Sequence, residues 1–103
     1  MDNEPIIFSY NDGSIHLKLY RVGDLMYLHR LAGPAKTIYY TTGQVGTEEY
    51  FVNGLRHREE GPAIIDYTIS GIVKYKAYHL SGLAVPVFSD EELKRFVKLM
   101  AFK

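Results

Sequence analysis

Short runs of β-branched, aromatic and other apolar side chains, separated by turns that contain glycine, fill most of the chain up to residue 84. Ile15, Leu17 and Leu19 alternate with polar neighbours, which is typical of a half-buried strand. Residues 35–40 and 63–67 are rich in β-branched and aromatic side chains, and the bulky residues stand at both odd and even positions. Because successive strand residues point to opposite faces, these runs predict a sheet that is partly covered on both sides.

After residue 86 the apolar spacing changes from two to three and four. The apolar positions there are Leu93, Phe96, Val97 and Met100. This stripe predicts an amphipathic helix over residues 89–102, and Ser89 with Glu92 forms a capping box at its start. We expect the helix to cover part of the sheet with its apolar stripe. The alternative is that the stripe binds a partner.

The strand-rich part of the chain contains a tandem duplication. Residues 29–56 align with residues 57–84 without a gap, and eleven of the 28 aligned positions are identical. A fixed period of this size indicates one supersecondary unit that is used again. The residues that link consecutive units, 29–34 and 57–62, are called the first and second joints below, and both contain His-Arg and Gly-Pro-Ala in the same places.

Each unit reads as two strands connected by a tight turn. The turn dipeptides are Thr42-Gly43 and Ser70-Gly71 between the strands, with Asn53-Gly54 and Ser81-Gly82 at the end of residues 45–52 and 73–80. Glycine after Asn, Ser or Thr is a hairpin signal, because such turns require positive φ. The two units therefore predict two hairpins that lie side by side.

The N-terminal segment resembles a degenerate copy of the same unit. Residues 5–10 align with residues 62–67, and residues 20–25 align with residues 50–55, followed by a longer joint. The alternation of residues 15–20 and the repeat alignment imply opposite directions for the Tyr20 side chain. The sequence does not decide between these two directions. A divergent first copy is typical of a capping repeat.

These observations predict one mainly β domain over residues 1–103, an antiparallel β-meander of tandem hairpin repeats with a C-terminal amphipathic helix packed on the sheet. Its parts are residues 5–28, 29–56, 57–84 and 89–102. We expect six or seven strands in the sheet. An open sheet has reactive edges, so self-association through an edge or a face is expected.

Composition removes several classes of function. The chain has 12 basic and 12 acidic residues, so nothing draws it as a whole toward nucleic acid or anionic membranes. It has no cysteine, which excludes disulfides and thiolate metal sites. The first five residues are acidic and polar and do not resemble a signal peptide, and no apolar run is long enough to span a membrane. We expect an intracellular protein that does not enter a membrane.

Residues 50–63 resemble a repeat of large DNA viruses and bacteriophages that is related to MORN-type repeats. The typical form is an aromatic strand, Asn-Gly, a short basic step and then His-Arg-Glu-Asp-Gly-Pro-Ala. Here Glu60 replaces the usual aspartate, and the first joint has Leu31 and Ala32 in place of the acidic pair. The resemblance covers residues 27–84. It implies stacked hairpins in a viral protein of the host cytoplasm or nucleus, and it brings no catalytic residues with it.

The densest polar cluster is the second joint. His57 and Arg58 could bind phosphate or carboxylate, since the arginine fork matches both groups. The same motif recurs in each unit, which favours a structural role in which Arg58 pairs with Glu59 or Glu60 and the histidine bonds a backbone carbonyl. The candidate contact residues are the joint residues Arg30, Arg56, His57 and Arg58 and the tyrosines expected to be exposed, Tyr40 and Tyr75.

Catalysis and metal binding have weak support in the sequence. No Gly-x-Ser-x-Gly, Walker or His-Glu-x-x-His motif is present. Glu48 and Glu49 are neighbours on a strand and point to opposite faces, so they do not form an acid/base pair by themselves. A zinc site from His29, His57 and Glu59 is conceivable but lacks the spacing of local zinc motifs. We therefore predict no enzyme, no cofactor and no metal.

The expected function is a non-enzymatic interaction module that binds a host or viral protein. Single-stranded nucleic-acid binding is the alternative, because tyrosines interleaved with basic residues on a sheet can stack bases. The tyrosines of this alternative are Tyr39, Tyr40, Tyr50, Tyr67, Tyr75 and Tyr78. Its basic residues are Arg30, Lys36, Arg56, Arg58, Lys74 and Lys76. Equivalent tyrosines in successive hairpins also form ordinary cross-strand ladders, and the neutral total charge counts against a strong phosphate binder.

Overall fold

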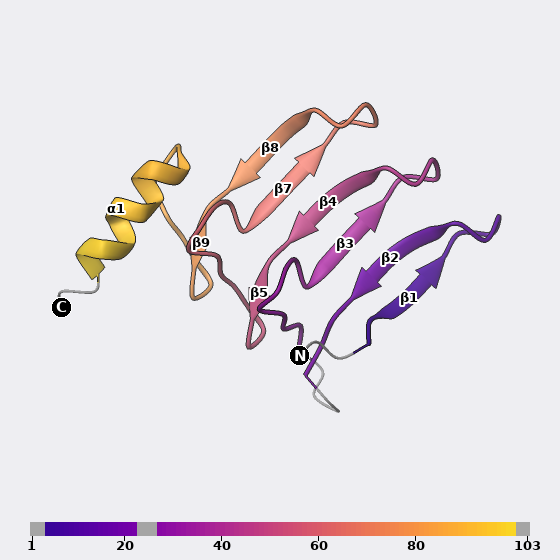
Figure 1. The fold of residues 1–103 in the computed structure, drawn as a ribbon, viewed down its shortest axis with the longest axis horizontal. Coiled ribbons are helices and arrows are strands. Elements are labelled where there is room, and N and C mark those ends of the chain that lie inside the picture. Colours follow the sequence, from indigo (N-terminus) through magenta and orange to yellow (C-terminus); the bar gives the residue numbers. More distant parts are fainter. Residues whose placement is uncertain (1–3, 23–26, 101–103) are drawn as a thin grey trace.

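Six strands form one antiparallel sheet in the computed structural model, which describes residues 4–22 and 27–100. The strands are β1 (Ile6–Ser9), β2 (Ile15–Leu19), β3 (Lys36–Tyr39), β4 (Val45–Glu49), β7 (Ile64–Tyr67) and β8 (Val73–Ala77). The strands lie in the sheet in the order β1-β2-β3-β4-β7-β8, which is also their order along the chain, and each one pairs with the strands next to it. Three hairpins thus lie in a row (Figure 1), and the predicted mainly β meander is confirmed.

Two small hairpins follow the second and third large ones. They are formed by β5 (Phe51–Val52) with β6 (Leu55–Arg56) and by β9 (His79–Leu80) with β10 (Leu83–Ala84). The expected single strand 45–52 therefore divides at Tyr50. Its amide donates to the Ala63 carbonyl at 2.7 Å in the next hairpin, and its carbonyl accepts from the His57 amide at 3.0 Å. Asn53-Gly54 and Ser81-Gly82 have positive φ, as the turn prediction requires.

The N-terminal hairpin has the geometry of the other two, with one correction to the alignment. All three hairpins contain a bulge before the turn, at the pairs Ser9↔Ile15, Tyr39↔Val45 and Tyr67↔Val73. Ser9 therefore corresponds to Tyr67, and the sequence alignment of residues 5–10 with residues 62–67 is wrong by one position. A shift of one residue exchanges the faces of a strand. The longer joint that follows contains residues 23–26, which lie outside the described residues.

The C-terminal helix α1 (Asp90–Met100) lies at the end of the row of hairpins, beyond β8 and β9 (Figure 1). Ser89 caps it, because the Ser89 hydroxyl accepts from the Glu92 amide at 3.2 Å. Leu93 is fully buried and packs in a cluster with Tyr78, Leu80 and Val85. The Tyr78 hydroxyl donates to Asp90 at 2.9 Å. Burial and this bond to a carboxylate raise the pKa of Tyr78 to about 12.

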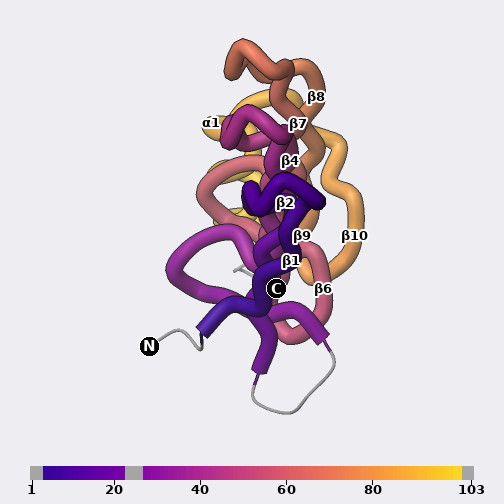
Figure 2. Tube along the Cα trace, turned by 90° about the vertical axis from the view of Figure 1, so that its right-hand side faces the viewer, coloured from indigo at the N-terminus to yellow at the C-terminus, as the bar shows by residue number. Residues whose placement is uncertain are grey.

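The molecule is a thin slab of 50 × 35 × 19 Å in its principal extents, and Figure 2 shows it nearly edge-on. β6 and β10 lie on one side of the slab, and the two joint loops project on the other. Within the described residues no second layer covers the six-stranded sheet, contrary to the expectation from its bulky side chains. The 11-residue helix packs beyond the last strands, so most strand positions in the sheet stay partly exposed.

Candidate interaction surfaces

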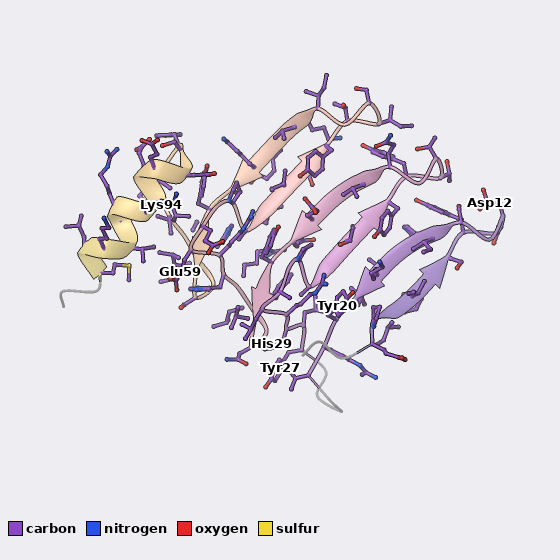
Figure 3. All side chains as sticks on the ribbon, viewed as in Figure 1. Asp12, Tyr20, Tyr27, His29, Glu59 and Lys94 are labelled. Atoms are coloured by element: carbon purple, nitrogen blue, oxygen red, sulfur yellow. The ribbon has the colours of Figure 1, made fainter. Side chains whose placement is uncertain are left out.

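The two joints share a set of histidine and arginine contacts at nearly equal distances. The Nδ1 atoms of His29 and His57 accept hydrogen bonds from the amides of Asn53 and Ser81, each at 2.9 Å. Each histidine thereby ties a joint to the tight turn that follows it 24 residues later. Figure 3 shows His29 and Glu59 at the same end of the sheet, opposite the hairpin tip that carries Asp12.

The joint arginines lie on tyrosine rings. The guanidinium carbon of Arg30 lies 3.9 Å from the Tyr20 ring centroid, and that of Arg58 lies 4.0 Å from the Tyr50 centroid. Nη1 of each arginine donates at 3.2 Å to the carbonyl of the proline in its own joint. Tyr20 therefore points in the direction that the repeat alignment implies, which resolves the question left open by the alternation.

An open cleft of about 410 Å³ lies between the two joints. Its lining residues are Arg30, Leu31, Ala32, Gly33, Tyr50, Val52, His57, Arg58, Glu59 and Glu60. The two arginines in the lining are balanced by the two glutamates. The arginine and histidine atoms that line the cleft already make contacts that recur in both joints. The cleft is therefore a consequence of how the two joints pack and is not by itself a sign of a binding site.

Two details of the expected joint are wrong. Arg58 does not pair with Glu59 or Glu60, since its guanidinium lies on Tyr50 and bonds the Pro62 carbonyl. His57 bonds a backbone amide rather than a carbonyl, and its Nε2 lies 3.0 Å from Glu59 Oε2. Stacking on the ring uses the face of the guanidinium and leaves its edge free to donate to the Pro62 carbonyl.

The three conceivable zinc ligands do not form one cluster, although His57 and Glu59 are in contact. Nδ1 of His29 and of His57 is occupied by a backbone amide. Among the described residues, no group of three or more His, Asp or Glu side chains could hold a metal ion. Within the same residues, no helix is both long and apolar enough to cross a membrane.

Arg56 lies on the other face of the sheet from Arg58. Its Nη2 and Nε atoms donate to one oxygen of Glu49 at 2.8 and 3.2 Å, and Lys36 Nζ lies 3.6 Å from the other oxygen. Glu49 is only 7% exposed, so its charge is compensated by these two cations. The neighbouring Glu48 points to the opposite face, as expected, and accepts from the Tyr67 hydroxyl at 2.7 Å. The predicted contact residues are thus divided between two faces.

Most tyrosines of the sheet are used inside the molecule. Tyr40, expected to be exposed, is half-buried, and its hydroxyl donates to the Tyr67 carbonyl at 2.7 Å. Tyr10 makes the same bond to the Tyr39 carbonyl. Burial and the bond to Glu48 raise the pKa of Tyr67 to about 12. The rings available to stack on bases are therefore fewer than the sequence pattern indicates.

Tyr75 differs from the other tyrosines of the six-stranded sheet because it is 53% exposed, as predicted. It lies on β8, which pairs with β7 and with no other strand of the described chain. The hairpin β7–β8 is called the last hairpin below. Its turn and edge carry four exposed large side chains, Ile69, Ile72, Val73 and Tyr75.

The three hairpin tips have one backbone and different side chains. The turn glycines Gly13, Gly43 and Gly71 have φ of 90°, 90° and 91°. The positions of Ile69 and Ile72 are held by Thr41 and Gln44 in the second tip and by Asn11 and Ser14 in the first. The sequence reasoning missed these isoleucines. The signal was present in the aligned units, where two polar tip residues become apolar.

Comparison of the chain with family models, with curated proteins and with solved structures gave no match.

Proposed function

We propose that this protein is a non-enzymatic interaction module that binds another protein through its last hairpin. The observation that carries the proposal is the change of chemistry at a fixed backbone geometry. Ile69 and Ile72 are 55% and 66% exposed, whereas the same turn in the other two hairpins carries polar residues. Exposed apolar side chains that gather at one place are typical of binding surfaces.

The edge strand adds to this surface. Val73 and Tyr75 continue the apolar character of the tip along β8, next to Lys74 and Lys76, which are also exposed. A protein partner can bury the apolar side chains and pair with the lysines at once. The molecule has a small core, since Leu93 of α1 is the one large side chain that is fully buried among the described residues. Such a molecule gains burial from a partner.

The joint residues support this function indirectly. Arg30, His57 and Arg58 hold consecutive units in register, and Arg56 compensates Glu49, so these residues position the last hairpin. This assignment moves the contact surface from the joints to Tyr75 and its neighbours. The viral setting and the intracellular location implied by the resemblance stay predictions.

The test is a capture experiment with a matched variant. Ile69→Thr with Ile72→Gln gives the last tip the side chains of the second tip, on a backbone that already accepts them. Thr41→Asn with Gln44→Ser, which gives the second tip the residues of the first, is the control. We expect proteins captured by the wild type and the control to be lost with the isoleucine variant. Equal capture by all three proteins would contradict the proposal.

The nucleic-acid alternative has its own test. A binder of single strands would shift short oligonucleotides at low salt, and the shift would weaken with added salt and with Arg56→Ala/Arg58→Ala. Since Arg56 and Lys36 are engaged with Glu49 and most ring faces or hydroxyls are occupied, we expect no shift. A salt-dependent shift that these two substitutions remove would favour the alternative.

A further inference from the structure

The free edge of β8 has its own hydrogen-bonding groups. In the second and third hairpins, an alanine amide donates to the last residue of the partner strand, Ala35 to the Glu49 carbonyl and Ala63 to the Ala77 carbonyl, both at 2.9 Å. Ala77 therefore faces β7, and the preceding residue, Lys76, presents its amide to the outside. The equivalent residue one unit earlier is Glu48, whose strand pairs on that side with β7. The edge of β8 thus offers the pairing groups that β4 uses inside the sheet.

The register of β4 with β7 shows what a further strand would meet. Glu49, Glu48 and Thr47 of β4 stand opposite Ile64, Ile65 and Asp66. On β8 the corresponding positions are Ala77, Lys76 and Tyr75. A strand added to β8 in this register would meet a small apolar residue, a lysine and an exposed aromatic ring in succession.

Two lysines on β8 favour an added strand with acidic side chains. Lys74 and Lys76 are exposed and have no acidic partner among the described residues, although Lys76 Nζ lies 5.9 Å from the Tyr78 ring centroid. A carboxylate opposite Lys76 would form a cross-strand ion pair, and an apolar or aromatic residue next to it would lie on Tyr75.

A second copy of β8 does not fit this edge. Two β8 strands that pair antiparallel and are centred on Tyr75 place Lys74 of each strand opposite Lys76 of the other. Like charges directly opposite each other destabilise a strand pair, and lysines on an edge are a common device against self-pairing. The last hairpin therefore carries apolar surface together with charges that disfavour its own copy.

From this edge we infer that the last hairpin binds an extended acidic segment of its partner as an added antiparallel strand, with a carboxylate opposite Lys76 and an apolar residue opposite Tyr75. This inference rests on the proposed function and names the chemistry of the partner. Main-chain hydrogen bonds supply general affinity in such strand addition, and the alternating side chains supply specificity.

The probe is a short labelled peptide in which valine and glutamate alternate around a central phenylalanine, and binding is measured by fluorescence anisotropy. A second peptide has lysine in place of each glutamate. Lys76→Glu should weaken binding of the acidic peptide roughly tenfold or more and strengthen binding of the basic one. Lys94→Glu, an exposed lysine on α1, is the matched control and should change neither (Figure 3).

Backbone pairing is tested separately from charge. Proline in place of the glutamate opposite Lys76 should abolish binding, whereas glutamine at the same place should only weaken it, because the amide of this residue is the one that donates to the outward-facing Lys76 carbonyl. Amide exchange at Lys76 should slow when the acidic peptide is present, while exchange at Ala77, which faces β7, should change less. Binding that survives the proline would overturn strand addition.

The remaining outcomes separate this inference from the proposed function. Absence of peptide binding, or binding unaffected by Lys76→Glu, rejects the acidic strand. A dimer that slows exchange at the Lys76 amide also rejects it in favour of a second copy. If capture of a protein nevertheless depends on Ile69 and Ile72, the proposed function stands without the acidic strand. If capture is independent of both residues, the proposed function fails as well.

Discussion

The joints and the hairpin tips recur with the same period, but the joints repeat their side-chain contacts whereas the tips repeat their backbone geometry. In the joints the side chains repeat together with their contacts, so that Arg30 and Arg58 lie 3.9 and 4.0 Å from equivalent rings and bond equivalent carbonyls at 3.2 Å. In the tips only the backbone repeats. The turn keeps φ close to 90° at its glycine, while the flanking side chains change from polar to apolar in the last hairpin.

This fold therefore tolerates variation at the hairpin tips more than at the joints. In a joint, particular side chains make the hydrogen bonds and ring contacts that hold the corner, and two of these bonds are partly buried. A donor or acceptor left unpaired in a buried place costs about 1–3 kcal/mol. A tip is exposed, and its geometry depends on one glycine and a few main-chain bonds. Specific chemistry can therefore be placed on a tip or on a free edge without cost to the fold. The following predictions test this division.

The largest effect is expected in the joint. Arg58→Ala removes the contact with the Tyr50 ring and the bond to the Pro62 carbonyl, and should lower the free energy of unfolding by about 2–3 kcal/mol. Denaturant unfolding measures the loss. Arg95→Ala on the exposed side of α1 is the control and should change stability little. A loss as small as that of the control would mean that the joint does not depend on its arginine.

In the tip, the backbone should matter more than the side chains. Gly71→Ala forces an alanine to φ near +91° and should cost about 1–2 kcal/mol, although nothing lies within 4 Å of the added methyl. Gly43→Ala should cost the same amount, because its φ is +90° and its surroundings are equally open. Thermal unfolding of both variants checks the equality. Unequal losses would show that the tips are not equivalent.

A gain of stability is expected where the third unit departs from the second. His79 replaces Phe51 in the equivalent small strand, and its buried Nδ1 has no hydrogen-bond partner. His79→Phe should raise the free energy of unfolding by about 1 kcal/mol, since it removes an unsatisfied polar atom. Phe51→His should have the opposite effect, and a reversed sign in either variant would contradict the equivalence.

The same histidine predicts a pH dependence. Burial, with a smaller effect from the charge of Arg56, lowers the pKa of His79 below its usual value of 6.5. The unfolded chain then binds more protons between the two pKa values, so stability is complete above pH 6.5 and falls as the pH drops below it. Unfolding curves between neutral and mildly acidic pH should show this slope in the wild type, and a smaller slope in His79→Phe.

The smallest effect on stability is expected from the tip side chains. Ile69→Thr with Ile72→Gln should change the free energy of unfolding by less than about 0.5 kcal/mol, because both isoleucines are mostly exposed. A loss of unfolding free energy comparable to that of Arg58→Ala would show that the isoleucines pack within the fold and are not available to a partner.

The sequence predicted the row of hairpins and the C-terminal helix, but it did not predict that the six-stranded sheet lacks a second layer within the described residues. The aligned glycines and the alternating apolar positions placed every large hairpin, and the capping residues placed α1. Three further features of the structure were not predicted from the sequence. The break at Tyr50 depends on a hydrogen bond to the next hairpin, and the one-residue shift of the first strand depends on a bulge. The stacking of Arg58 on Tyr50 competes with the nearby Glu59 and Glu60, and residue types alone do not decide such a competition.

The candidate site was predicted only in part. Tyr75 was assigned to the exposed surface correctly, whereas Tyr40 was not, because its hydroxyl reaches a carbonyl of the neighbouring hairpin. Arg56 and Arg58 are close in sequence but lie on opposite faces, which depends on the turn of the chain through β5 and β6. Ile69 and Ile72 were recognised as a candidate surface only from the structure. Their turn has the same backbone as the turns of the other two hairpins, which carry polar residues at the same positions.

If the joints build the fold and the last hairpin binds the partner, unfolding and binding to the captured partner should respond independently to changes in the last hairpin, and both are measured in parallel. The protein to compare with the wild type is the combined variant Ile69→Thr, Ile72→Gln, Lys76→Glu. We predict an unchanged unfolding midpoint together with loss of binding. Binding that persists at wild-type strength in this folded variant would contradict the account.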